Sequence, residues 1–189
     1  MPAASLRFSH FGLHVIDMAR MEDFYARVLG FTVTDRGQLQ RPNGSVDLVF
    51  LSRDPNEHHQ IVLASGRPDA SGFNPINQLS FKTDTLGGLK ALHASLMAEG
   101  LRDISPITHG NALSVYARDP EGNRLELYFD LPWYVTQPVA VPVDLSLPEA
   151  EIMSRAEAHA RSMQGFRSRA QWRDEMAKRM AEDSGRSPI

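Results

Sequence analysis

The sequence predicts an α+β fold made of two paired βαβββ modules and a C-terminal helical extension. Strand-like and helical runs follow one another in the order strand, helix and three strands. The same order occurs a second time after residues 65–75, a stretch with the Gly, Pro and Ser composition of a linker. Beyond Pro132 the chain becomes first Pro-rich and then helical in its spacing. A length of 189 residues suits two small fused modules with room for a core.

The first module is expected at residues 1–65. Residues 6–16 alternate between apolar and polar side chains, as a strand does. Residues 18–30 place Met21, Phe24, Tyr25 and Val28 on one helical stripe, and Gly30 is a natural stop for that helix. Three strand-like runs follow, separated by the turn signals RPNG and DPNE, at residues 31–37, 45–52 and 59–65.

The second module is expected at residues 76–135, after a linker at residues 66–75. A strand-like run at residues 76–84 precedes a helical run at residues 86–100. Three further strand-like runs complete the module, at residues 104–108, 112–119 and 123–130.

Two stretches indicate an internal duplication at the level of single residues. The segments Phe50–Leu63 and Val115–Tyr128 share an apolar or aromatic pair, then Arg-Asp-Pro, then an apolar strand. Each segment lies at the same place in its module. The two modules are therefore expected to be related by a pseudo-twofold axis.

Residues 136–189 are expected to form an extended segment and two amphipathic helices. Ser146 and Glu149 have the spacing of a capping box. Such helices cover a domain or pack on a partner subunit. The apolar stripes contain Ile152, Ala156, Met163, Trp172, Met176 and Met180, with an interruption at Gly165.

Composition excludes several classes of function. The net charge of −3 is interspersed and contains no basic patch of the kind that nucleic acids require. No segment has the length and apolarity of a membrane span, and the first residues lack a signal-peptide core. The absence of cysteine excludes disulfides, thiolate ligands and thiol nucleophiles. We expect a cytoplasmic protein that acts on small molecules.

Several polar side chains stand inside otherwise apolar strands, and each has an ordinary structural explanation. A histidine such as His10 is more often a hydrogen-bonded core residue than a ligand. Gln78 could satisfy backbone groups, and Glu126 could lie on a solvated face. If Glu126 is buried, however, its carboxylate must be paired, protonated or bound to a metal, because an isolated buried charge is very costly.

The duplication joins these positions into one predicted site. His10 and Gln78 correspond on the first strands of the two modules. Gln60, or His59 if the loop lengths differ, corresponds to Glu126 on the last strands. A pseudo-twofold axis would bring the four positions around one cup. Nitrogen and oxygen donors without sulfur suit a divalent ion such as Fe(II), Mn(II), Ni(II) or Zn(II).

The segments HFGLHVIDMARMEDFYARVLGF and YARDPEGNRLELYFD resemble the opening and closing segments of the vicinal oxygen chelate superfamily. This superfamily contains glyoxalases, bleomycin- and fosfomycin-resistance proteins and type I extradiol dioxygenases. The resemblance covers residues 6–133 and is strongest toward proteins related to biphenyl-diol and catechol dioxygenases. It implies paired βαβββ modules that form a half-barrel cup around a divalent metal.

The resemblance also implies a metal-ligand set. The first ligand position is His10, seven residues before Asp17, which leaves His14 as a structural strand residue. The glutamate of the closing strand is Glu126. The remaining position, histidine in extradiol dioxygenases, is Gln78 here. A glutamine can coordinate through its amide oxygen, but it is a weaker donor than imidazole.

Three further residues match positions that act on the substrate in extradiol dioxygenases. The second histidine of NEHHQ, His59, is implied to be the acid–base residue beside O2. Tyr116 and His109 are implied to hold the substrate and polarise its ring. We therefore expect an oxidoreductase that cleaves a catechol-like diol with O2, with Fe(II) as the favoured metal.

The sequence leaves two other functions open. The first is a glyoxalase-like isomerase or lyase, which needs a base rather than a redox metal. The second is a metal-free protein of the bleomycin-resistance kind, which only sequesters a ligand. Members of the superfamily pair modules within or between chains, and we expect a homodimer built in part by the C-terminal helices.

The two adjacent histidines, His58 and His59, pose a question of orientation. Strict alternation along a strand places His58 and Gln60 in the cup and His59 on the face that packs on the helix. The resemblance instead places His59 in the cup. A bulge or a late start of the strand would reconcile the two. We predict that His59 faces the cup, with His58 as the alternative.

Overall fold

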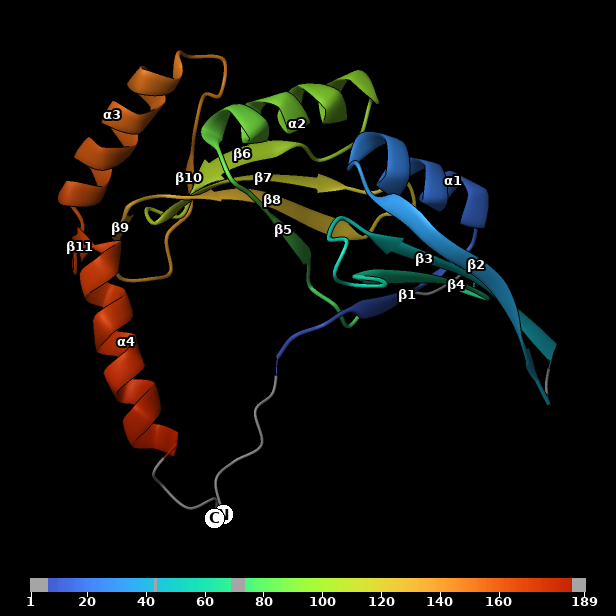
Figure 1. The fold of residues 1–189 in the computed structure, drawn as a ribbon. Coiled ribbons are helices and arrows are strands. Elements are labelled where there is room, and N and C mark those ends of the chain that lie inside the picture. Colours follow the sequence, from blue (N-terminus) through green and yellow to red (C-terminus); the bar gives the residue numbers. More distant parts are fainter. Residues whose placement is uncertain (1–6, 43, 69–73, 185–189) are drawn as a thin grey trace.

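The computed structural model describes residues 7–42, 44–68 and 74–184. Two βαβββ modules follow one another along the chain, and a helical extension completes it (Figure 1). The helices α1 and α2 lie on the same side of the two sheets (Figure 1). The α+β fold predicted from the sequence is confirmed.

The first module contains one helix and a four-stranded sheet in the order β1-β4-β3-β2. Strand β1 pairs with β4 in parallel, and the other neighbours are antiparallel. The elements are β1 (Phe11–Val15), α1 (Met18–Asp23), its π-helical continuation η1 (Phe24–Val28), β2 (Thr32–Arg41), β3 (Gly44–Ser52) and β4 (Ile61–Ser65).

The second module repeats this pattern. Strand β5 pairs with β8 in parallel, as β1 does with β4, and the sheet order is β10-β6-β7-β8-β5. The elements are β5 (Leu79–Thr83), α2 (Leu86–Ala98), β6 (Ser105–Thr108), β7 (Ala112–Arg118) and β8 (Arg124–Asp130), joined later by the short β10 (Val141–Pro142).

Local sequence explains the predicted first helix. The Asp17 side chain accepts a hydrogen bond from the backbone N–H of Arg20 and so caps the helix start. Met21 and Tyr25 are completely buried, which fixes the face that packs on the sheet. Gly30 has a φ of 72°, and this left-handed conformation ends the helix.

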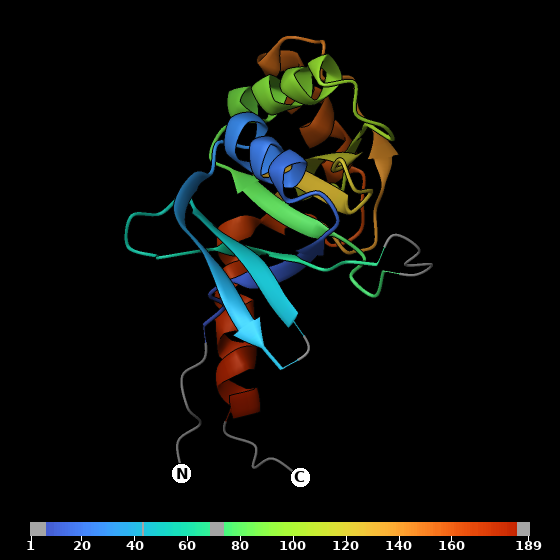
Figure 2. The same cartoon turned by 90° about the vertical axis from the view of Figure 1, so that its right-hand side faces the viewer.

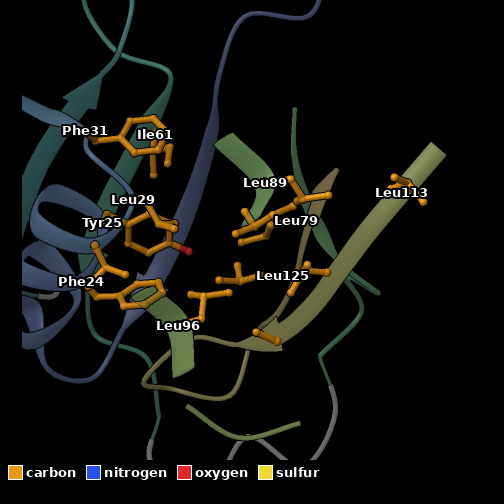
Figure 3. Close-up of a cluster of buried hydrophobic side chains, with 14 of the residues drawn as sticks. Phe24, Tyr25, Leu29, Phe31, Ile61, Leu79, Leu89, Leu96, Leu113 and Leu125 are labelled. Atoms are coloured by element: carbon orange, nitrogen blue, oxygen red, sulfur yellow. The ribbon is translucent and has the colours of Figure 1, made fainter. Parts of the chain in front are cut away.

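The two modules share one hydrophobic core although their sheets are separate. Figure 3 shows side chains of the first module, among them Phe24 and Tyr25, pointing toward Leu96 and Leu125 of the second. Phe81 of β5 contacts three aromatic rings of the first module, with centroid separations of 5.7 to 6.5 Å. Each sheet remains open, with β1 and β5 as edge strands, so the modules form a half-barrel rather than a closed barrel.

The loop that precedes β8 connects the modules through polar contacts. Glu121 accepts hydrogen bonds from the backbone N–H groups of Ile16 and Asp17, at 2.7 and 2.8 Å, where β1 leads into α1. Its other carboxylate oxygen lies 3.3 Å from the Arg67 guanidinium, and its side chain is only 4% exposed. The buried Asp119 accepts a hydrogen bond from the Tyr25 hydroxyl. Burial raises the pKa of Asp119, against the hydrogen bonds that it accepts.

We expect Glu121→Ala to lower the free energy of unfolding by about 1–3 kcal/mol, because it removes the acceptor of two backbone donors. Urea denaturation measures the change. Glu182→Ala serves as the control, since Glu182 is exposed on the last helix, and it should change stability by less than about 0.5 kcal/mol. Equal stability of the two variants would contradict this role for Glu121.

The extension begins with β9 (Trp133–Tyr134), which pairs with β11 (Arg167–Ser168). The helices α3 (Glu149–Arg161) and α4 (Arg169–Ser184) are separated at Gly165, as expected. Helix α3 buries Ile152, Ala156 and Ala160, whereas α4 runs past the sheets (Figures 1 and 2). Trp172 and Met176 of α4 are only partly buried, and Met180 is 64% exposed.

The predicted capping box of the third helix is wrong. Pro148 is the N-cap of α3, and no side-chain hydrogen bond caps it. Ser146 does not cap the helix because its N–H and its hydroxyl both donate hydrogen bonds to the carboxylate of Asp144.

Part of the predicted linker at residues 66–75 lies outside the described residues, since residues 69–73 are not described. The boundaries between modules, at residues 65/66, 75/76 and 135/136, stay a prediction. None of the described helices is long and apolar enough to cross a membrane.

Candidate functional site

The carboxylate of Glu126 is the centre of a buried polar cluster on the second sheet. Its Oε2 accepts hydrogen bonds from Gln78 Nε2 and Ser80 Oγ, both at 2.7 Å. Its Oε1 accepts from Ser114 Oγ at 2.9 Å and from the Tyr116 hydroxyl at 3.0 Å. Glu126 itself is only 8% exposed. Of the alternatives left open by the sequence, a solvated face is therefore excluded: the carboxylate is buried and hydrogen-bonded.

Strand register explains how these residues meet. Glu126 lies opposite Ser80 of β5 on one side and opposite Tyr116 of β7 on the other. Side chains alternate along a strand, so Gln78 joins Ser80 on one face, and Ser114 joins Tyr116. All five side chains therefore point to the face away from the buried leucines of β8.

His109 extends this cluster. Its Nε2 lies 3.1 Å from the Tyr116 hydroxyl and 3.4 Å from Glu126 Oε1. Its Nδ1 lies 2.6 Å from the carbonyl oxygen of Val139. Because a carbonyl can only accept, Nδ1 donates the hydrogen bond to Val139, which leaves Nε2 as the ring atom that faces the Tyr116 hydroxyl. Burial, and then the hydrogen bond to Glu126, raise the pKa of Tyr116, so its hydroxyl stays protonated near neutral pH.

The Pro-rich segment after β9 holds His109 in place. The Gln137 side chain donates to the carbonyl oxygen of His109 at 2.7 Å and accepts from the N–H of Val139 at 3.2 Å. Strand β10 then pairs with β6, which immediately precedes His109. The segment therefore contributes directly to the site.

The predicted residues of the first module form a separate group of histidines. The rings of His10 and His59 lie 4.2 Å apart, and the Nδ1 atoms of His58 and His59 are 2.9 Å apart. The rings of His58 and His59 both contact Phe50 of β3. Burial lowers the pKa of His59, and the charges of His10 and His58 lower it further. His59 is therefore favoured in its neutral form, which is the form that accepts a proton.

Strict alternation does not apply to the histidine pair, because β4 begins only at Ile61. His58 and His59 precede the strand, and His59 lies beside His10. The Gln60 side chain instead accepts a hydrogen bond from the backbone N–H of Arg53. Of the two ways to reconcile strand alternation with the resemblance, a bulge or a late start of the strand, the structure has the late start.

The correspondence of Gln60 or His59 with Glu126 is wrong. Phe11 pairs with Ile61 in the first sheet, and Leu79 pairs with Leu125 in the second. With Phe11 equivalent to Leu79, the residue equivalent to Glu126 is Val62. The loop after Arg-Asp-Pro is one residue longer in the first module, and both His59 and Gln60 precede β4, which begins at Ile61.

The donor set fits a divalent metal in its chemistry. Gln78 and Glu126 are in contact and both carry oxygen donors, and His10 supplies an imidazole on the chain just before β1. Such nitrogen and oxygen donors suit a hard or borderline divalent ion. Within the described ranges no three His, Cys, Asp or Glu side chains form a group that could hold a metal ion. The predicted set has only two residues of these types, with an amide as the third.

Two cavities adjoin the cluster. The larger, about 1150 Å³, lies between the edge strands β1 and β5 and is lined by Gln78, Ser80 and several aromatic rings. The smaller, about 270 Å³, is lined by Tyr116 on the other side of Glu126. Of the six predicted site residues, the larger cavity touches only Gln78.

The structure thus divides the predicted site into two groups. Gln78, His109, Tyr116 and Glu126 meet on the second sheet, whereas His10 and His59 meet at the edge of the first. The catalytic roles of these residues stay a prediction.

Sequence reasoning missed two members of the Glu126 cluster. Ser80 lies two residues after Gln78, and Ser114 lies two residues before Tyr116. The alternation of strand side chains places each serine on the same face as its predicted neighbour. This spacing was the signal that could have identified them.

Comparison with protein families gives one match over most of the fold. Residues 7–127 match the model of the glyoxalase/bleomycin resistance protein/dioxygenase superfamily. Biphenyl-2,3-diol 1,2-dioxygenase 2 of Rhodococcus globerulus is 31% identical over 131 residues, which are 67% of this chain and 64% of the relative. Biphenyl-2,3-diol 1,2-dioxygenase 3 of the same organism is 31% identical over 129 residues, 66% of this chain and 63% of the relative. The chain therefore spans less than two thirds of the length of these relatives.

Solved structures share the fold at lower identity. A glyoxylase/bleomycin resistance protein/dioxygenase domain from Frankia sp. EAN1pec is 20% identical, with a TM-score of 0.53 over 68% of this chain and 100% of that domain. A glyoxalase family protein from Bacillus cereus is 15% identical, with a TM-score of 0.52 over 68% of this chain and 97% of that protein. These similarities concern the fold alone.

Proposed function

Because the chain belongs to the glyoxalase/bleomycin resistance protein/dioxygenase superfamily, we propose that it is a metal-dependent extradiol-type dioxygenase that cleaves a catechol-like diol with O2. The observation that carries this proposal is the buried cluster of Glu126, Tyr116 and His109. Sequence relatives named as biphenyl-diol dioxygenases support the same reaction class.

The family and these relatives imply a divalent metal. In this proposal His10, Gln78 and Glu126 hold it, and Fe(II) is the favoured ion, ahead of Mn(II), Ni(II) and Zn(II). When bound, it supplies a Lewis acid that lowers the pKa of a diol hydroxyl and, as Fe(II), access to O2.

The second module holds and orients the substrate. Tyr116 keeps its proton and donates a hydrogen bond, so its hydroxyl can turn from Glu126 to an oxygen of the diol. His109 Nε2 lies 3.1 Å from the same hydroxyl and helps to position it. Four donors hold the Glu126 carboxylate in one position.

The first module supplies the proton acceptor. His59 is neutral near pH 7 because burial lowers its pKa, so it can take a proton from the diol and later return it. His58 is the alternative base. Its ring is exposed and lies 4.0 Å from Asp35, which makes it less suited to this role.

A homodimer and a cytoplasmic location belong to the same proposal. The extension supports an assembly role, because the described part of α4 contains no buried residue.

The test is an assay of the full chain, purified anaerobically and loaded separately with Fe(II), Mn(II), Ni(II) or Zn(II). We expect oxygen consumption and a coloured ring-fission product from a panel of catechols with Fe(II). Metal-dependent turnover without oxygen consumption would instead establish a glyoxalase-like isomerase or lyase. Tight binding of a diol without metal uptake or turnover would establish a sequestering protein.

A further inference from the structure

The small pocket beside Tyr116 has a basic wall. It encloses about 270 Å³ and shares the Tyr116 side chain with the Glu126 cluster. Ile107 of this pocket lies opposite Ser114, which donates to Glu126. The pocket is lined by Asp103, Ser105, Ile107, Tyr116, Ala117, Arg118 and Arg124.

The two arginines of this pocket differ in their partners. Arg118 forms an ion pair with Asp103 at 2.7 Å and also donates to the carbonyl oxygen of Gly122. The Arg124 guanidinium lies over the Tyr116 ring, 4.2 Å from its centroid. Across the part of the chain that the structure describes, no carboxylate lies within ion-pair distance of Arg124. Among these described residues, the pocket therefore carries one positive charge without a neutralising anion.

Arg124 points to the same side of the sheet as the Glu126 carboxylate. It precedes Glu126 by two residues on β8, and side chains two apart share a face. Apart from this contact with the Tyr116 ring, the Arg124 guanidinium donates no hydrogen bond to the described residues. Its in-plane N–H groups remain suited to a bidentate contact with a carboxylate.

We propose that the pocket binds a carboxylate group of the substrate through Arg124, so that the preferred substrate is an anionic aromatic diol. This inference rests on the proposed function, because it places the diol at Glu126 and Tyr116. The ring then lies over the cluster, and its acidic substituent reaches Arg124.

The size of the pocket limits what it accepts. Pockets that enclose a whole drug-sized ligand occupy about 300–1000 Å³. A volume of about 270 Å³ lies just below that range, so it has room for one substituent of the substrate rather than for a whole drug-sized molecule. The larger cavity beside Gln78, with its aromatic walls, is the place for apolar bulk.

A purely structural role makes a different prediction. If Arg124 only supports the Tyr116 ring, its removal weakens the binding of all diols to the same degree. If it binds the substrate, its removal weakens the binding of acidic diols and leaves the binding of their neutral counterparts unchanged. The ratio between the two classes therefore separates the roles.

The experiment compares 3,4-dihydroxybenzoate with 3,4-dihydroxybenzamide, which has a similar shape but no charge. Binding to the anaerobic full chain is measured by calorimetry, and turnover of both is followed by oxygen consumption. We expect the wild type to bind the acid about 10- to 100-fold more tightly than the amide, as fits one charge-assisted bidentate contact. Arg124→Gln should remove this preference, and most of the loss should appear in KM rather than in kcat.

Two further variants complete the test. Arg124→Lys keeps the positive charge but loses the planar pair of N–H donors that makes a bidentate contact, so it should retain only part of the preference for the acid. Arg173→Gln removes one exposed arginine of α4 and should bind both compounds as the wild type does. An unchanged ratio of acid to amide in Arg124→Gln overturns the proposal, and so does an equal loss for both compounds.

The outcomes distinguish this inference from the proposed function. If the chain prefers the acid through Arg124 but cleaves no ring with any metal, the proposed carboxylate pocket stands and the proposed dioxygenase activity is rejected. If it cleaves the ring without preferring the acid, the dioxygenase activity stands and the carboxylate pocket is rejected.

Discussion

Glu126→Gln is expected to lower kcat/KM for diol cleavage by about 100-fold or more, because it replaces the charged member of the proposed metal-ligand set by a neutral amide. The substitution removes the negative charge and replaces one oxygen by an NH2 group. That NH2 group faces two donors, either Gln78 and Ser80 or Ser114 and Tyr116. Steady-state kinetics and metal content of the same preparation measure the effect.

The fold should survive this substitution. Loss of a buried charge reduces a desolvation cost, while the donors lose part of their acceptor. The free energy of unfolding should therefore change by less than about 3 kcal/mol, a range that urea denaturation resolves.

Asp130→Asn is the matched control, because it converts another carboxylate of β8 into an amide. Asp130 forms ion pairs with Lys82 and Arg169, outside the cluster. We expect it to keep activity within a few-fold of the wild type. Activity of Glu126→Gln at the level of this control would remove Glu126 from the proposed mechanism.

The sequence predicts the module architecture well for a physical reason. Alternation and helical spacing report burial directly, and both patterns occur twice in the chain. Glu126 was identifiable for the same reason, because a carboxylate inside an apolar strand must find partners. The family resemblance assigned roles to His10, Gln78 and Tyr116, whose neighbours in space no local pattern reveals.

Contacts made at long range or by the backbone escaped prediction. The carbonyl oxygen of Val139, which fixes the proton of His109, has no sequence signal, since every residue carries a carbonyl. Gln137 stands in a segment with the composition of a connector, and only the fold brings it to His109. The residue equivalent to Glu126 is Val62, two residues beyond Gln60, and the longer loop of the first module accounts for one residue of this difference, which repeat matching without coordinates does not resolve.

The glycine after His109 is where the site depends most on backbone geometry. Gly110 has a φ of 75°, and its carbonyl oxygen accepts a hydrogen bond from the Trp133 indole at 2.7 Å. A Cβ at this position would lie 2.4 Å from Cγ2 of Val135, inside any permitted contact. Any side chain there must strain the backbone and displace the segment that holds His109.

We expect Gly110→Ala to lower the free energy of unfolding by about 2–5 kcal/mol. About 1–2 kcal/mol comes from the left-handed backbone and about 1–3 kcal/mol from overpacking against Val135. Gly122→Ala separates the two contributions, because Gly122 has a φ of 84° but a Cβ added there would meet no atom within 4 Å. It should therefore show the backbone cost alone. Urea denaturation of both variants measures the difference, and equal losses would mean that Val135 yields without cost and that the segment over His109 is not tightly packed.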